Sequence, residues 1–390
     1  MDEDNYNFSV TIGKVFTVSL VSKPDKPHKG MPSARSGHAA VANNKNLYIY
    51  GGYNPDHRET LPYNPLFKEM WKFNFDDQSW QLIQNRGTTP FQLASMSMVR
   101  CGDIIVLYGG TGYPFGFQKS SSLYCFDIKD NRWRVMSGSK QLPESTYGQA
   151  MSIIGPNLFV FGGTSGWDYS ANVHKTDLRT GVWEKCFDFE KHITMLVKGQ
   201  LNDDHVPYPR YRHEMLSDEE NFYVIGGGTS LHAFGLETIH VFNTKLYEWK
   251  NRITLADPVH GFPTKRRCHG CCQLGNNGYI TGGFNGRRIF DDIWRLSIDT
   301  LQWMKLDARL PEPVYFHSSA ITPEGCLYCH GGVITQNGSK RTDKLNFIWV
   351  CVPSLVTIAW RRILKFNPSV RKLSDEALRG LGIPQHIVKR

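Results

Sequence analysis

The sequence predicts an all-β fold, a six-bladed propeller, because three features recur in register along its 390 residues. Six short apolar runs each end in a glycine pair, and the first glycines are Gly51, Gly109, Gly162, Gly226, Gly282 and Gly331. A tryptophan follows each of the first five pairs: Trp80, Trp133, Trp183, Trp249 and Trp303. Thirteen residues before each first glycine, or fourteen in the last unit, stand His38, Met96, Gln149, His213, His269 and His317. Constant spacing within units and variable spacing between them indicates fixed strands joined by variable loops.

Each feature has a physical role in a propeller blade. The apolar runs suit strands that neighbouring sheets cover on both faces. A glycine pair at the end of such a strand allows backbone angles and a close approach that a Cβ atom would prevent. The tryptophan is a large wedge for the space between blades. The pattern resembles the kelch repeat, whose units of about 50 residues are four-stranded blades.

The sixth repeat lacks one strand. It contains an apolar segment at 316–321, its glycine pair and a third strand at 345–351, but no fourth strand with a tryptophan follows. A matching apolar segment, 15–21, precedes the first repeat, and we expect it to form the outer strand of blade six. A ring closed in this way by both ends of the propeller leaves no free junction. We therefore expect the propeller over residues 15–352, after a flexible N-terminus of residues 1–14.

Composition excludes several classes of protein. The net charge is +9, from 45 Lys and Arg against 36 Asp and Glu, but residues 353–390 hold eight basic and two acidic residues. The excess therefore belongs mostly to this tail, and we expect no nucleic-acid partner. No apolar run reaches the roughly 18 residues of a membrane helix, so no membrane partner is expected either. An acidic N-terminus and nine scattered cysteines suit a protein of the cytoplasm or nucleus with free thiols.

Enzyme motifs are incomplete. His213-Glu214 begins like a metalloprotease helix, but Ser217 stands where the second histidine is needed. Two CxxC pairs, Cys268 with Cys271 and Cys326 with Cys329, have the spacing of a zinc site. Both pairs lie on expected inner strands, so buried thiols are the favoured interpretation and zinc is the alternative. The recurring histidines are interpreted as buried and hydrogen-bonded, and we expect a non-catalytic protein with no metal or cofactor.

The tail after residue 352 predicts short helices. Residues 353–364 read as an amphipathic helix, with Ser354 as its N-cap and Leu355, Ala359 and Ile363 on one face, widened by Ile358. A second helix is expected after Ser374, because acidic residues fill its first turn. Ile383-Pro384 can begin a third, with proline in its first position.

This tail resembles the docking segment of ubiquitin ligase receptors. Ser354-Leu355, Ala359 and Ile363, with Ile358, are similar to a BC box, the elongin-C-binding helix of cullin ligase receptors. Ile383, Pro384 and Ile387 resemble the start of a cullin-2 box, whose last apolar position would fall beyond Arg390. A kelch propeller followed by this segment, 353–390, is identified as a member of the kelch domain-containing protein 10 family. The resemblance implies a receptor that binds elongins B and C and cullin-2 with its RING-box protein, and that recruits proteins with degron C-termini, especially glycine-ended ones.

In the kelch propellers that this chain resembles, ligands bind at one mouth of the central channel. The residues two before the recurring position are Ser36, Ala94, Tyr147, Tyr211, Arg267 and Tyr315. Those after the glycine pairs are Tyr53, Thr111, Thr164, Gly228, Phe284 and Val333. A peptide carboxylate favours a planar, bidentate arginine. We therefore expect Arg267, with Arg210, Arg212 or Arg287, to bind the carboxylate while Tyr211 and Tyr315 pack on the peptide.

Two other functions remain as alternatives at this stage. Kelch propellers also serve as scaffolds or bind cytoskeletal proteins such as actin. A propeller oxidase would need copper ligands and is usually secreted, a context that this sequence does not offer.

Overall fold

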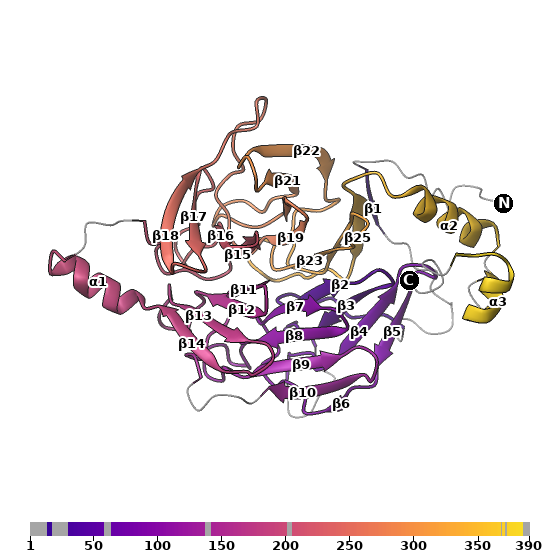
Figure 1. The fold of residues 1–390 in the computed structure, drawn as a ribbon, viewed down its shortest axis with the longest axis horizontal. Coiled ribbons are helices and arrows are strands. Elements are labelled where there is room, and N and C mark those ends of the chain that lie inside the picture. The colour runs from indigo at the N-terminus through magenta and orange to yellow at the C-terminus, as the bar shows by residue number, and fades with distance from the viewer. Residues whose placement is uncertain are drawn as a thin grey trace.

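Six sheets surround a central channel in the computed structural model of the protein (Figure 1). The structure describes residues 14–17, 30–57, 64–136, 142–200, 205–367, 369–370 and 373–384. The first strand of each sheet lies next to the channel and contacts the first strands of the two neighbouring sheets. The six-bladed propeller is therefore confirmed.

The strands follow one another outward from the channel in each blade. Blade one contains β2 (Ala39–Ala42), β3 (Asn46–Tyr50), β4 (Met70–Asn74) and β5 (Ser79–Ile83). Blade two contains β7 (Ser97–Cys101), β8 (Ile104–Tyr108), β9 (Leu123–Asp127) and β10 (Arg132–Met136), with β6 (Arg86–Gly87) beside β10. Blade three contains β11 (Ala150–Ile154), β12 (Asn157–Phe161), β13 (Val173–Asp177) and β14 (Trp183–Phe187).

The other half of the ring repeats this order. Blade four contains β15 (Glu214–Ser217), β16 (Asn221–Ile225), β17 (Thr238–Asn243) and β18 (Glu248–Ile253). Blade five contains β19 (Gly270–Leu274), β20 (Asn277–Thr281), β21 (Asp292–Ser297) and β22 (Trp303–Arg309). Blade six contains β23 (Ser318–Ile321), β24 (Cys326–His330), β25 (Leu345–Trp349) and the N-terminal β1 (Val15–Thr17).

The N-terminal strand closes the ring as the sequence predicts. β1 runs antiparallel to β25, with Phe16 opposite Phe347, and the two rings stack with centroids 5.3 Å apart. Residues 18–21 of the expected strand, and the expected flexible segment up to residue 13, lie outside the described residues. Blade six therefore combines strands from both ends of the propeller.

The core is divided among the interfaces between blades. Each of the six large apolar clusters joins residues of two neighbouring blades. The recurring tryptophans lie on the fourth strands, as expected of wedges: Trp133 packs 4.9 Å from the ring of Tyr50 in the preceding blade. Trp183 and Trp249 make the same contact with Tyr108 and Phe161. Trp133, Trp249 and Trp303 are buried and Trp80 and Trp183 partly so, and the burial of these rings adds to the attraction between adjacent blades.

The glycine pairs allow adjacent blades to approach closely. All twelve of these glycines have a positive φ. At the junction of blades six and one, a Cβ on Gly331 would lie 2.7 Å from the carbonyl oxygen of Arg35. The next amide, that of Gly332, donates a hydrogen bond of 2.8 Å to the same oxygen. The glycine pair is therefore part of the contact that closes the ring.

Replacing Gly331 by alanine should destabilise the propeller more than the same change in an open turn. Gly275→Ala is the matched control, because Gly275 also has a positive φ, +54°, but its Cβ would meet nothing within 4 Å. The control should cost about 1 kcal/mol of unfolding free energy, from the left-handed backbone alone. Gly331→Ala should cost about 3 kcal/mol, since the clash with Arg35 adds to that strain. Equal midpoints in urea denaturation would contradict this role of the glycine pair.

Three helices lie outside the sheets in the described part of the chain. α1 (Phe189–Val197) follows β14 and projects from the rim, whereas α2 (Leu355–Phe366) and α3 (Asp375–Gly380) lie beside blade six (Figure 1). Ser354 caps α2 by accepting from the amide of Thr357, and Ser374 caps α3 in the same way, as the sequence predicts. None of the described helices is long and apolar enough to span a membrane. The expected third helix extends into residues 385–390, which lie outside the described residues.

Candidate functional site: the channel mouth and the C-terminal helix

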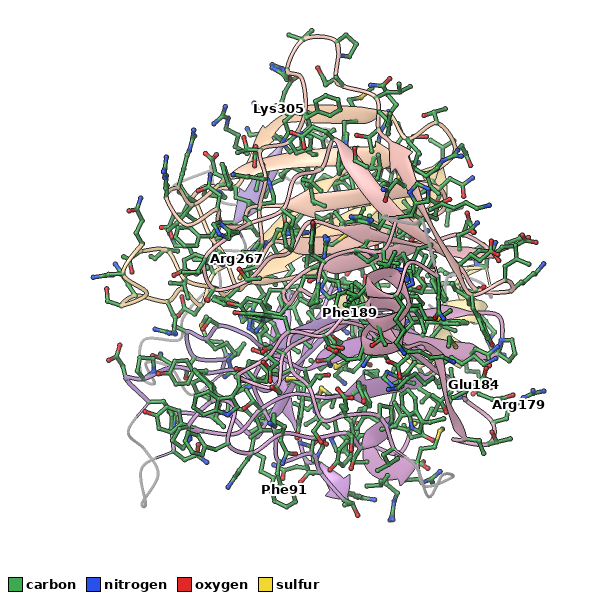
Figure 2. The ribbon with its side chains drawn as sticks, turned by 90° about the vertical axis from the view of Figure 1, so that its left-hand side faces the viewer. Phe91, Arg179, Glu184, Phe189, Arg267 and Lys305 are labelled. Atoms are coloured by element: carbon green, nitrogen blue, oxygen red, sulfur yellow. The ribbon has the colours of Figure 1, made fainter. Side chains whose placement is uncertain are left out.

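The two sets of residues expected at the mouth pair with each other in every blade. Ser36 bridges Tyr53 in blade one, and the other five pairs follow the same pattern: Ala94 with Thr111, Tyr147 with Thr164, Tyr211 with Gly228, Arg267 with Phe284, and Tyr315 with Val333. Each second residue also bridges a third one, which begins the approach to the next strand. Figure 2 shows the propeller edge-on, with Arg267 toward one face and Arg179 and Glu184 on the other.

A closed ring of backbone hydrogen bonds lies at this end of the channel. Its members are the six residues that directly precede the recurring position: Gly37, Ser95, Gly148, Arg212, Cys268 and Phe316. The amide of each donates to the carbonyl of its neighbour in the adjacent blade, over 2.7 to 3.0 Å. All six have φ between +53° and +67°, which turns each chain sharply into its inner strand. Such a ring holds the mouth residues at fixed positions.

Arg267 has the geometry expected of an anion-binding residue. Its side chain is 9% exposed, and no described residue accepts a hydrogen bond from its buried Nη1. Burial raises the pKa of Tyr315, and Arg267 is close enough to oppose that rise. It acts in the same direction on Tyr211. A buried, unpaired guanidinium nitrogen is costly unless a ligand supplies the acceptor.

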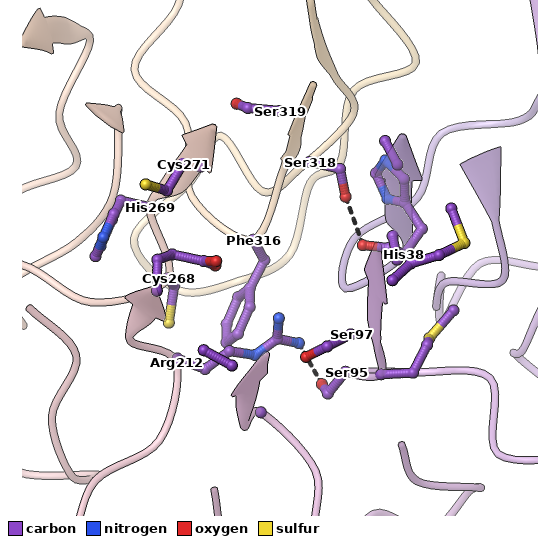
Figure 3. Close-up of a pocket in the computed structure, with 18 of the residues that line it drawn as sticks. His38, Ser95, Ser97, Arg212, Cys268, His269, Cys271, Phe316, Ser318 and Ser319 are labelled. Carbon is purple, nitrogen blue, oxygen red and sulfur yellow. Dashed lines mark hydrogen bonds between the residues drawn. The ribbon is translucent and has the colours of Figure 1, made fainter. Parts of the chain in front are cut away.

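Arg212 occupies the channel just below the mouth. Its Nη2 donates to Ser95 Oγ, its guanidinium lies 4.6 Å from the ring centre of Phe316, and its Nε is buried without a partner among the described residues. Figure 3 shows the side chains of Arg212 and Phe316 together across the pocket. Burial lowers the pKa of Arg212. Arg212 and Arg267 both lower the pKa of Cys268 against the larger effect of burial, so each of the two cations lies close to Cys268.

Below these residues the channel holds a cavity of about 110 Å³. Glu214 of β15 lines it, and burial raises the pKa of its carboxyl to about 8, although Arg212 opposes this shift. Half of the remaining lining is small, from Ala, Gly, Ser and Cys residues, and the other half is larger and includes the four recurring histidines. Arg212, Cys268 and Phe316 of the backbone ring also line the cavity, so it continues directly from the mouth.

Aromatic rings surround the two arginines. Tyr315 stacks on Phe284 with centroids 5.0 Å apart, and Tyr211 lies 5.4 Å from Tyr169. Tyr53 is half-buried, and Ser36 Oγ contacts its carbonyl oxygen at 3.4 Å. Tyr147 lies beside Arg212, which opposes the burial-driven rise in its pKa. The structure thus brings Ser36, Tyr53, Tyr147, Tyr211, Arg267, Phe284 and Tyr315 to one mouth.

The C-terminal helix α2 has one face in solvent and one against the protein. Leu355 is 84% exposed and Ile363 42% exposed, and Ala359 between them is also exposed. Ile358 is half-buried beside them. The four residues expected to bind elongin C therefore form a continuous apolar strip along the helix, next to the capping Ser354.

The opposite face of α2 fixes the helix to its surroundings. Trp360 and Leu364 are buried in a cluster with Val370 and Leu378, so α2 packs on α3. Arg361 lies 4.5 Å above the ring of Trp349, the last residue of β25. Burial raises the pKa of Tyr328, whose hydroxyl is within reach of Arg361. These contacts hold α2 against blade six.

Comparison with known proteins identifies the family of the chain. A family model described as the KLHDC2/KLHL20/DRC7 Kelch-repeats domain matches residues 17–194 and 185–372. Kelch domain-containing protein 10 of the rat is 43% identical over 96% of this chain and 89% of its own length. The human protein of the same name is 44% identical, over 92% of this chain and 80% of its own. The chain belongs to the kelch domain-containing protein 10 family. A Drosophila homologue of that name is 33% identical and a cattle kelch domain-containing protein 3 is 26% identical.

Membership of the kelch domain-containing protein 10 family gives the chain a protein-interaction role. Kelch propellers are typically non-catalytic interaction domains, and none of these relatives carries the name of an enzyme. The names of the relatives do not mention a ligase, a partner or a compartment. Those finer assignments depend on the site itself.

Arg210 does not lie at the mouth of this kelch propeller. It is 3% exposed, donates from Nη1 to the carbonyl of Gly226 at 3.0 Å, and packs 4.3 Å from the ring centre of Phe234. Arg35 and Arg266 make the same contacts at the same repeat position, with Gly51 and Gly282. Burial lowers the pKa of Arg210 to about 9. Its expected role as a carboxylate ligand is therefore wrong, because the side chain is enclosed within blade four.

Arg341, and not Arg287 as the sequence suggested, contacts the residues of the mouth. Arg287 is exposed on the loop after Phe284, and its carbonyl, rather than its guanidinium, holds a contact, with Gln336. Arg341, which the sequence analysis missed, lies 4.9 Å over the ring of Tyr53 and donates from Nε to Ser36 Oγ at 3.1 Å. Its backbone forms a β-bridge with Val333, so Arg341 is the third residue of the mouth in blade six. The loop between the glycine pair and this third residue differs in length from blade to blade. Counting residues along the sequence therefore could not locate Arg341 at the mouth.

The cullin-box residues are only partly described. Ile383 is half-buried against the cluster of α2 and α3, and Pro384 is exposed. Ile387 lies outside the described residues. Ile383 thus connects the expected cullin segment to the helix that carries the expected elongin face.

The recurring histidines are buried, as are Cys268, Cys326 and Cys329 of the CxxC pairs, whereas Cys271 is partly exposed. Burial raises the pKa of Cys268 and Cys326 to about 12 and of Cys329 to about 11, which keeps them as thiols. Within the described residues, no three His, Cys, Asp or Glu side chains are grouped as a metal site would require. The histidines are buried as expected, but their hydrogen bonding is incomplete: neither ring nitrogen of His269 has a partner among the described residues.

Proposed function

We propose that this protein is the substrate-recognition subunit of a cullin-2 ubiquitin ligase, acting in the cytoplasm or nucleus. The observation that carries the proposal is the solvent-exposed strip of Leu355, Ala359 and Ile363 on a helix whose other face is fixed to the propeller. An exposed leucine on a preformed helix suits an apolar groove, and the alanine permits close approach. Elongin C, with elongin B, is the partner that such a helix fits.

The cullin would be bound by the segment that follows α3. Ile383 and Pro384 emerge beside the cluster that supports α2, so elongin C and cullin-2, with its RING-box protein, would meet on one side of blade six. The loops around one end of the channel form the propeller mouth. Elongin C and cullin-2 bound beside blade six would leave this mouth free for the substrate. The protein would then connect the two without taking part in the chemistry.

The substrate would be the C-terminal tail of another protein. A carboxylate placed between Arg267 and Arg212 would satisfy the two buried nitrogens that have no acceptor in the described structure. Tyr211 and Tyr315 would contact the peptide on either side. A tail that ends in glycine fits best, because a residue without a side chain allows the carboxylate to approach these enclosed arginines closely.

Loss of the Leu355 side chain should abolish elongin binding and leave the propeller folded. Leu355→Ala removes the most exposed apolar contact of α2, and Ala359→Phe blocks close approach, so each should reduce co-purification of elongins B and C at least tenfold. The measurement is affinity purification of the full-length variants from cells, with circular dichroism to check folding.

Leu246→Ala is the control, because Leu246 is another strongly exposed leucine, at 63%, on the turn between β17 and β18. It should co-purify elongins as well as the unmodified protein does. Absence of elongins from the unmodified protein would overturn the proposal and favour a scaffold or actin-binding propeller.

A further inference from the structure

One side of the mouth carries exposed aromatic side chains that the carboxylate site does not use. They stand on the loops that follow the glycine pairs of blades two and three: Phe115 is 43% exposed, Phe117 74% and Trp167 80%. These three residues are referred to below as the aromatic platform. Large exposed rings that gather at a mouth are typical of a contact surface, since their exposure to water is unfavourable in the free protein.

The loops that carry the platform are held in place by contacts with each other. Gly116 and Gly166 meet so closely that a Cβ on Gly166 would lie 2.9 Å from the Cα of Gly116. Lys119 Nζ donates to the carbonyl oxygen of Ser165 at 2.8 Å, which ties blade two to blade three. Tyr169 accepts at its hydroxyl from the amide of Ser230, 2.7 Å away, which ties blade three to blade four. A surface fixed in this way binds at a lower entropic cost.

The platform is continuous with the arginines. The hydroxyl of Tyr147 lies 3.6 Å from the position of a Cβ on Gly166, and the same side chain lies beside Arg212. Tyr147 alone therefore separates the platform from the carboxylate site. About two residues of extended peptide would cover the span between the two sites. Residues from the third position before the end of a bound tail would reach the platform.

Charge sets the direction of a tail across the mouth. Arg212, Arg267 and Arg341 belong to blades four to six, whereas the platform loop of blade three exposes the carboxylate of Asp168. The ammonium group of Lys119, which donates to the carbonyl oxygen of Ser165, keeps its positive charge and offsets that of Asp168, so these two charges do not attract a carboxylate as the arginines do. A terminal carboxylate is thus attracted to blades four to six, and the preceding residues extend toward blades two and three.

We propose that the aromatic platform selects tails with a large apolar or aromatic side chain at the third to fifth position from the end. This inference rests on the proposed binding of C-terminal tails and adds a second determinant to it. The arginines would bind the terminal carboxylate, and Phe117 and Trp167 would contact the large side chain at the third to fifth position from the end.

The test is a selection of protein C-termini. A displayed library with eight random residues before a free carboxylate is bound to the full-length protein, to the double variant Phe117→Ser with Trp167→Ser, and to Leu246→Ser as an exposed-residue control. We expect large apolar residues to be enriched at least fivefold at the third to fifth positions from the end. The double variant should lose this enrichment, and the control should keep it.

The best tail is then synthesised as an acid and as an amide. If the acid binds more tightly than the amide but the double variant keeps the enrichment, the platform inference is wrong and the proposed tail binding stands. If acid and amide bind equally, or if no tail is selected, both are wrong. If the double variant loses both acid binding and its folded circular dichroism spectrum, the single variants Phe117→Ser and Trp167→Ser are tested instead. Each should reduce the enrichment at least twofold.

Discussion

Amidation of the terminal carboxylate is expected to weaken the binding of a tail to this propeller at least a hundredfold, or about 3 kcal/mol. The reason is the state of Arg267, which is 9% exposed with a buried nitrogen that lacks an acceptor among the described residues. An acid tail would supply a charged acceptor to it, and an amide tail would leave the nitrogen unpaired and bury a neutral group instead. The measurement is fluorescence anisotropy of one labelled tail in both forms.

The variant Arg267→Met should reproduce this loss for the acid tail. Methionine keeps part of the apolar volume of the side chain but removes the donors, so the acid and the amide should then bind to within a fewfold of each other. Arg287→Met is the matched control, since Arg287 is an exposed arginine of the same blade. It should leave the difference between acid and amide intact. If Arg287→Met removes that difference and Arg267→Met does not, the carboxylate lies on the loop and not at the channel.

The sequence predicted that Arg267 lies at the mouth, because its position within the repeat corresponds to a position in the propeller. Residues at one repeat position occupy equivalent places in a propeller, so the position two before the recurring residue predicts the mouth in all six blades. The same register could have excluded Arg210. Arg35, Arg210 and Arg266 share one repeat position, and the structure gives all three the same two kinds of contact, with a glycine carbonyl and a phenylalanine ring. An arginine that recurs in three blades indicates a structural role.

Other parts of the site were beyond sequence reasoning. Arg341 reaches Tyr53 from a loop whose length differs from that of the corresponding loops, so no count along the chain places it. The ring of left-handed residues has no shared side chain, because glycine, serine, arginine, cysteine and phenylalanine all occupy it. The backbone hydrogen bonds around the channel impose this conformation on whatever residue is present. The helix face was predictable, since the spacing of Leu355, Ala359 and Ile363 alone places them in one line.

Acidification from pH 7.5 to pH 5 is expected to destabilise the propeller by several kcal/mol. Burial lowers the pKa of His213 and His330 to about 3 and of His317 to about 4, and holds those of His38 and His269 well below the ordinary value. The unfolded chain binds protons at these groups from about pH 6.5 downward, whereas the folded chain does not. Stability therefore falls as the pH drops below 6.5, by about 2 kcal/mol per neutral histidine at pH 5.

Glu214 opposes part of this loss. Burial raises its pKa to about 8, so the folded chain takes up a proton there as the pH falls from 8 toward the ordinary value, and this uptake stabilises the fold. Glu214→Gln should therefore make the fall in stability between pH 7.5 and pH 5 steeper. The opposite result would mean that the carboxyl is solvated through the channel.

The histidines can be tested one at a time, because two blades show what else fits their position. Met96 and Gln149 occupy in blades two and three the place that His213 occupies in blade four, and all three are buried. His213→Gln should thus fold, and its urea-unfolding free energy should fall by about 2 kcal/mol less than that of the unmodified protein between pH 7.5 and pH 5. His260→Gln, a change at an exposed turn, should leave the pH dependence as it is. If both variants behave alike, the acid sensitivity does not arise from the inner strands, and the neutral histidines there are not what limits the stability of the ring.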